Sequence, residues 1–272
     1  MVIVNRYLIK KYFLALLLLY ICPSLIYAQT KKEPLFGKSE ESYRIKSSSL
    51  KGAVFYLVSG HGGPDPGCIG KYQGKELHED EYAYDIVLRL GKNLLERGAK
   101  VHFIIQDSKD GIRNTHILKN SKRETCMGKS IPLNQIQRLQ QRCDAINQLY
   151  RKEKGAYKRA VFIHIDSRSR KKQTDVYFYH AKGSSKGKRL AKQLQSTFRA
   201  KYNQHQPGRG FGGTVSERNL YVLNKTTPVA VFLELGNIQN SLDQKRLVIP
   251  DNRQALANWI AEAMVADYAR SK

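Results

Sequence analysis

The sequence has 272 residues, of which 47 are lysine or arginine and 23 are aspartate or glutamate, giving a formal net charge of +24. The length and the 41% hydrophobic content suffice for one sizeable core, which excludes an intrinsically disordered chain. The charge indicates either attraction to a polyanion, such as nucleic acid, a membrane face or an acidic envelope polymer, or a basic surface without that role. Because no nucleic-acid-binding motif accompanies it, we expect no nucleic-acid partner.

Residues 1–28 follow the plan of a secretory signal peptide. Basic residues precede an apolar core at Tyr12–Cys22, and Ala28 offers a small residue for cleavage. The core is shorter than the roughly 20 apolar residues that span a bilayer comfortably. We therefore expect export to the periplasm or cell envelope, with membrane contact only through this segment. Retention of the segment as an uncleaved anchor is the alternative.

Residues 29–50 are polar and rich in lysine and serine, which is typical of a linker, so the folded domain is expected to cover residues 51–272. Three cysteines follow the predicted signal: Cys68, Cys126 and Cys143. An odd number leaves at least one thiol free in a monomer. Cys126 and Cys143 could form a disulfide, but their spacing does not establish it.

From residue 53 onward the pattern alternates between strands and helices. The predicted strands are 53–59, 100–106, 159–165, 175–180 (an edge strand), 220–223 and 229–235. The predicted helices are 79–97, 132–154, 184–203 and 253–268. Residues 107–131 form a long polar segment that we interpret as a loop or lid. The alternation predicts an α/β fold with a mostly parallel sheet covered by helices on both faces.

Ligands of such sheets bind outside the carboxyl ends of the strands, and candidate side chains fall there. His61 lies in a Gly-His-Gly-Gly turn after the first strand, and His164 lies near the end of another. Glu79 opens the first helix, where a glutamate often only faces the helix dipole. Each histidine alone could be an ordinary loop or core residue. Glu234 is harder to dismiss, because it lies inside an apolar strand and an isolated buried charge is costly.

Together these residues suggest a metal site. Two imidazoles and one carboxylate, from His61, His164 and Glu79, are typical ligands of a catalytic zinc ion with one open coordination position. Glu234 would then be the catalytic carboxylate, which accepts a proton from water and delivers it to a leaving nitrogen. The expected reaction is hydrolysis of an amide.

Four motifs occur in order: GHGGPDPG at 60–67, Glu79 at a helix start, FIHID at 162–166, and PVAVFLELGN at 228–237. With Arg142 and Asn147 in the middle helix, they resemble the zinc-dependent N-acetylmuramoyl-L-alanine amidases of bacterial cell walls (the Amidase_3 type). The resemblance covers residues 53–269. Matched by position, His61, Glu79 and His164 correspond to the zinc ligands and Glu234 to the catalytic glutamate. Glu76 and Glu81 lie close to Glu79, which fits the family pattern best.

The resemblance implies a twisted six-stranded sheet and cleavage between the lactyl group of N-acetylmuramic acid and L-alanine. It implies Zn²⁺ as cofactor, peptidoglycan as partner, a possible protein activator, and a role in wall remodelling and daughter-cell separation. The chain departs from the family at Val58-Ser59, where Asp-Pro is usual, and at Gln106-Asp107, where Thr-Arg is usual. The segment 108–131 also looks enlarged. A catalytically degenerate wall-binding module of the same fold is the alternative.

Overall fold

The computed structural model describes residues 30–167 and 172–272, so the predicted signal peptide lies outside the described residues. Its main sheet has six strands in the spatial order β12-β11-β13-β10-β3-β6. These strands are β3 (Ala53–Ser59), β6 (Lys100–Phe103), β10 (Tyr157–Asp166), β11 (Tyr177–His180), β12 (Thr214–Glu217) and β13 (Val229–Asn237). Only the β11–β13 pairing is antiparallel within this sheet. The predicted α/β fold with a mostly parallel, six-stranded sheet is confirmed.

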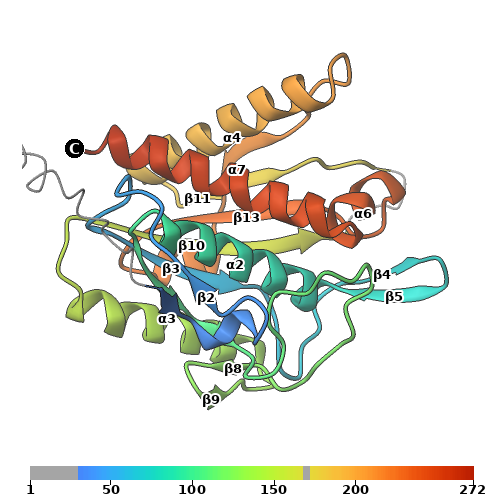
Figure 1. The fold of residues 1–272 in the computed structure, drawn as a ribbon, viewed down its shortest axis with the longest axis horizontal. Helices are drawn as coiled ribbons and strands as arrows, with labels where there is room; N and C mark the ends of the chain where they lie inside the picture. Colours follow the sequence, from blue (N-terminus) through green and yellow to red (C-terminus); the bar gives the residue numbers. More distant parts are fainter. Residues whose placement is uncertain (1–29, 168–171) are drawn as a thin grey trace, which may run out of the picture.

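Helices cover both faces of this sheet. They are α2 (Glu79–Glu96), α3 (Gln135–Lys152), α4 (Ser185–His205), α5 (Tyr221–Lys225), α6 (Ser241–Val248) and α7 (Pro250–Ala269). Side chains alternate along a strand, so Phe55 and Leu57 of β3 enter one core together with α2, α4 and α7. Tyr56 and Val58 enter a second core with α3 and α5. Figure 1 shows α3 separated from α4 and α7 by the strands.

Short elements complete the fold. They are β1 (Lys31–Lys32), η1 (Pro34–Phe36), β2 (Ser42–Tyr43), β4 (Ile69–Tyr72), β5 (Lys75–His78), β7 (Ile105–Gln106), β8 (Thr125–Cys126) and β9 (Lys129–Ser130). The hairpin of β4 and β5 projects from the body of the molecule (Figure 1). Strands β7, β8 and β9 form a small antiparallel sheet. Strands β8 and β9 lie within the predicted loop 107–131, whereas β7 is the end of the predicted strand 100–106, which the structure divides into β6 and β7.

The expectation of a linker before residue 51 needs correction for residues 30–50. Phe36 and Leu50 are fully buried in the core, and the Phe36 ring lies 5.7 Å from the ring of Phe103. Lys92 also donates to the carbonyl of Glu40. The segment is polar on average, but two apolar side chains are enough to fix it to the domain.

Other differences concern short elements. Residues 220–223, expected as a strand, lie at the start of helix α5, since a short apolar run fits either structure. Strand β12 occupies the sheet edge predicted for β11, and α6 was not predicted. Cys68, Cys126 and Cys143 are all free thiols, so no Cys126–Cys143 disulfide is present. Within residues 30–167 and 172–272, no helix combines the length and apolar character needed to span a membrane.

Candidate active site

His61 is held in position by the turn that follows β3. Its backbone φ is +60°, an uncommon conformation for a residue other than glycine. Its Nδ1 lies 2.7 Å from Asp65 Oδ2, and a guanidinium N–H of Arg142 donates to its carbonyl oxygen. A side chain at Gly60 would place its Cβ 2.3 Å from the ring of His164. The turn thus fixes the His61 ring and leaves room for a second imidazole.

Glu79 is the first residue of α2 and is 1% exposed. Its Oε1 lies 3.0 Å from His164 Nδ1, and its Oε2 lies 3.3 Å from His61 Nε2. The backbone N–H groups of Ile165 and Cys68 donate to the same carboxylate, each at 3.0 Å. These bonds hold both carboxylate oxygens toward the two histidines.

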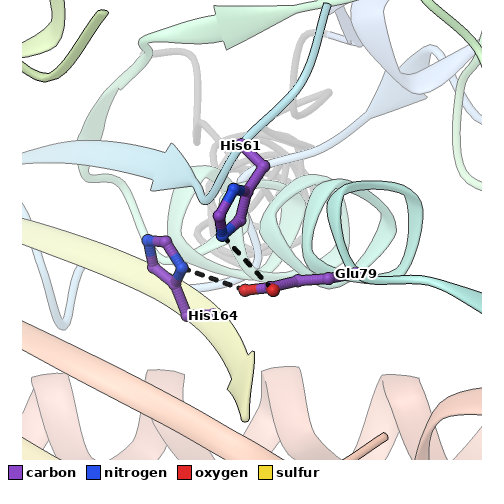
Figure 2. Close-up of side chains that lie close together, drawn as sticks. All are labelled: His61, Glu79 and His164. Atoms are coloured by element: carbon purple, nitrogen blue, oxygen red, sulfur yellow. Dashed lines mark hydrogen bonds and ion pairs between the residues drawn. The ribbon is translucent and has the colours of Figure 1, made fainter. Parts of the chain in front are cut away.

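His164 projects from the carboxyl-terminal part of β10. Its ring stacks on Phe232 at 4.2 Å and meets the His61 ring edge-on at 5.1 Å. Figure 2 shows His61, Glu79 and His164 converging from a turn, a helix and a strand. One ligand atom from each residue lies within 4.8 Å of the other two. The structure therefore brings together the three side chains selected from the sequence as metal ligands.

The alternative glutamates point elsewhere. Glu76 Oε2 lies 3.2 Å from His78 Nε2, outside the cluster. Glu81 forms an ion pair with Arg113 at 2.7 Å. Neither carboxylate belongs to the group formed by Glu79 and the two histidines.

Glu234 lies on β13 directly beside His164 of β10 in the parallel register. Paired residues of adjacent strands project from the same face of a sheet, so the two side chains share one side. Glu234 is partly exposed, unlike the buried residues on either side of it. Burial, Glu79 and Glu234 each raise the pKa of the Cys68 thiol, which places Glu234 within electrostatic reach of the cluster.

The carboxylates of Glu79 and Asp65 create a negative potential at the cluster, which favours a bound proton or metal cation. Burial disfavours protonation of His61, but Asp65 and Glu79 outweigh it and raise its pKa to about 10. Burial lowers the pKa of His164, which favours its neutral form. Burial also opposes ionisation of Glu79, yet hydrogen bonds from the two histidines hold its pKa well below the ordinary value. The site thus combines an ionised carboxylate with nitrogen donors.

Sequence reasoning did not assign the role of Asp65. Its Oδ1 accepts from the Gly67 N–H and its Oδ2 contacts both His61 and Arg138, so it orients the His61 ring. The sequence did carry a signal for this role. Asp65 lies four residues after the candidate ligand His61, and a metal-binding histidine usually donates its second ring N–H to a carboxylate, a carbonyl or water. Asn147 instead contacts the backbone of residues 225 and 227 and supports the loop before β13.

A cleft opens beside the two histidines between β3, β10 and α3. Its lining residues are Val58, His61, Asp65, Gln135, Arg138, Leu139, Arg142, Phe162, His164 and Val222. The two arginines come from α3, and the apolar residues come from β3, β10, α3 and α5. The cleft has a volume of about 40 Å³, so it admits little more than a water molecule in this conformation.

The family model described as N-acetylmuramoyl-L-alanine amidase (Amidase_3) matches residues 56–266. A curated relative, the germination-specific N-acetylmuramoyl-L-alanine amidase of Bacillus subtilis (strain 168), is 23% identical over 228 residues, which are 84% of each chain.

Solved structures agree on the fold. The CwlD amidase of Clostridioides difficile, solved in complex with the GerS lipoprotein, has a TM-score of 0.58 at 19% identity and aligns with 80% of this chain and 99% of its own. A second similar structure is the catalytic domain of CwlV, an N-acetylmuramoyl-L-alanine amidase of Bacillus (Paenibacillus) polymyxa var. colistinus. It has a TM-score of 0.57 at 22% identity, and the alignment covers 81% of this chain and 99% of the CwlV domain. Since the family model spans most of the sequence, this protein belongs to the N-acetylmuramoyl-L-alanine amidase family.

Proposed function

We propose that the protein is a zinc-dependent peptidoglycan hydrolase that cleaves the amide bond between N-acetylmuramic acid and the L-alanine of the stem peptide. The single observation that carries the proposal is the convergence of His61, Glu79 and His164, whose ligand atoms lie within 4.8 Å of one another. Membership of the amidase family supports the choice of bond.

The donor set fits zinc. Zinc in catalytic sites commonly takes two histidines and one carboxylate and keeps a further position open. When bound, zinc would supply Lewis acidity that polarises the scissile carbonyl and makes water more acidic. Asp65 accepts from His61 Nδ1, which directs Nε2 toward Glu79 and the proposed ion. Phe232 stacks on His164 and limits its rotation.

Glu234 is the proposed general base and acid. As the neighbour of His164 on the adjacent strand, it lies on the same side of the sheet as the ligands. Its carboxylate would accept a proton from the attacking water and return it to the departing nitrogen of L-alanine. The residue is partly exposed, while its Oε2 atom is buried on the protein side.

Mass spectrometry of purified peptidoglycan after digestion tests the reaction. The wild-type protein should release stem peptides that begin with L-alanine, and Glu234→Gln should bind zinc normally but release none. Glu217→Gln is a matched control, because Glu217 is an exposed carboxylate on the edge strand β12. Retained cleavage by Glu234→Gln would remove the proposed role. Wall binding without cleavage by the wild-type protein would favour the degenerate module.

We extend the proposal to cellular context. Peptidoglycan lies outside the cytoplasm, which supports export through residues 1–28 and a role in wall remodelling and daughter-cell separation. A relative solved with the GerS lipoprotein supports a protein activator as well. Leu133, just before α3, and Ile136, in its first turn, are 77% and 64% exposed. They flank Gln135 of the cleft lining and are suitable positions for testing such contact by charge substitution.

A further inference from the structure

A second group of carboxylates lies next to the proposed zinc site. Asp80 and Glu81 follow Glu79 in the first turn of α2, and Glu124 comes from the enlarged segment between β7 and β8. One carboxylate oxygen from each of Asp80, Glu81 and Glu124 lies within 4.8 Å of the other two. All three residues are buried, with exposures of 3%, 1% and 6%. Such a concentration of acidic groups away from water needs compensation.

The surrounding residues compensate only part of this charge. Arg113 forms an ion pair with Glu81 at 2.7 Å. Glu124 Oε2 accepts from the Gly63 N–H at 2.8 Å, and Asp80 Oδ1 accepts from the Glu81 N–H at 2.9 Å. Within residues 30–167 and 172–272, no lysine or arginine forms an ion pair with Asp80 or Glu124. When all three carboxylates are ionised, the guanidinium of Arg113 leaves two negative charges without a counter-charge.

Asp80 supplies an observation independent of the clustering. Among the described residues, its buried Oδ2 has no hydrogen-bond partner. A carboxylate oxygen of Asp80 lies within 4.8 Å of oxygens of both Glu81 and Glu124, so Asp80 faces both neighbours. A cation bound between the three carboxylates would give this buried oxygen a partner.

We propose that Asp80, Glu81 and Glu124 bind a second divalent cation, Ca²⁺, as a structural ion beside the zinc site. Donors that are all carboxylate oxygens favour hard cations over zinc. Calcium accepts six to eight oxygen ligands in a flexible geometry, whereas Mg²⁺ demands near-ideal octahedral geometry and usually keeps several waters, so a buried group of protein carboxylates favours Ca²⁺. The two uncompensated charges match one divalent ion.

The proposed ion would join three parts of the active-site scaffold. Glu124 binds the backbone of Gly63, two residues after His61. The N–H of Asp80 donates to the carbonyl of Pro66 at 3.2 Å, in the same turn. A cation shared by α2 and segment 107–131 would therefore hold His61 and Glu79 in their relative positions. This gives the enlarged segment a structural role that is separate from substrate contact.

The test uses the exported chain with its zinc retained. The protein is dialysed at length against calcium chloride, gel-filtered, and analysed for both metals by mass spectrometry, and its melting temperature is measured with and without calcium. We expect one calcium per chain and a higher melting temperature in calcium. Asp80→Asn, which keeps the acceptor for the Glu81 N–H, should retain at least tenfold less calcium with unchanged zinc. Asp144→Asn, at an exposed position on α3, should behave as the wild type.

Glu124→Gln provides a second variant in case Asp80→Asn does not fold, and it should also lose calcium. Absence of retained calcium in the wild-type protein would overturn the proposal. The proposal would equally fail if a second zinc occupied the site, or if both variants retained calcium as well as the wild type. None of these readouts depends on amidase activity, so the result is independent of the proposed function.

Discussion

Substituting Gly60 by alanine should dismantle the metal site while leaving the fold intact. A Cβ at this position would lie 2.3 Å from His164 Cε1, and ordinary contact begins near 3.4 Å, so the ring must move by about 1.1 Å. Metal–ligand distances in working sites hold to about ±0.2 Å, and a misplacement of about 1 Å can cost about 10²-fold in rate. The ring of Phe232 stacks on His164 at 4.2 Å, so the imidazole cannot move away from a Cβ at position 60 in that direction without displacing Phe232.

We therefore expect Gly60→Ala to lose zinc affinity and at least about 10²-fold of the rate of stem-peptide release. The cost in folding free energy should be only about 1–3 kcal/mol, because this is one overpacked contact. Zinc is titrated against a chelating dye, and folding is followed by circular dichroism. Gly212→Ala is the control, since its Cβ would meet nothing closer than 3.4 Å. Normal zinc affinity in Gly60→Ala would refute this reasoning.

Three further predictions concern other parts of the molecule. Asp65→Asn removes the carboxylate bonded to His61 and should weaken zinc affinity about 10–100-fold in the same titration, whereas unchanged affinity would deny it an orienting role. Burial opposes ionisation of Asp267, but hydrogen bonds led by Arg189 hold its pKa below the ordinary value. The ionised Asp267 carboxylate therefore contributes its full stabilisation of the folded state above about pH 4, the ordinary pKa of an aspartate. This contribution is lost as the pH falls through the lower pKa that Asp267 has in the folded protein. In Asp267→Asn, the free energy of unfolding, measured with urea, should therefore depend less on pH in the acidic range than in the wild type. An unchanged pH dependence would contradict this. Phe36→Ala should cost about 3–5 kcal/mol in the same assay, and a loss below 1 kcal/mol would mean that residues 30–50 are not part of the core.

The main elements could be predicted because their sequences carry strong periodic signals. Strand β3 and helix α2 were predicted to within one residue at each end, since continuous apolar runs and a helical stripe have few alternative structures. The short elements were less predictable. The run at 220–223 fits a strand or a helix equally well, and its packing against α3 decided the outcome. Phe36 and Leu50 are isolated apolar anchors in a polar segment, which no periodicity reveals.

The site residues could be selected because their types and order resemble a known family. Their convergence could not be derived from spacing, because His61 and His164 are brought together by the pairing of β3 with β10. The carboxylate cluster was missed for a related reason. Asp80 and Glu81 read as ordinary acidic residues at a helix start, and Glu124 lies more than 40 positions later in a segment without periodicity. Only the tertiary packing of segment 107–131 brings the three together.

The central claim is that His61, Glu79 and His164 hold one zinc ion beside Glu234. Anomalous X-ray diffraction from crystals of the zinc-loaded protein, recorded on both sides of the zinc absorption edge, tests it most directly. We expect one strong anomalous peak within bonding distance of His61 Nε2, the Glu79 carboxylate and a His164 ring nitrogen. A peak elsewhere, or none at this position in protein shown to contain zinc, would contradict it.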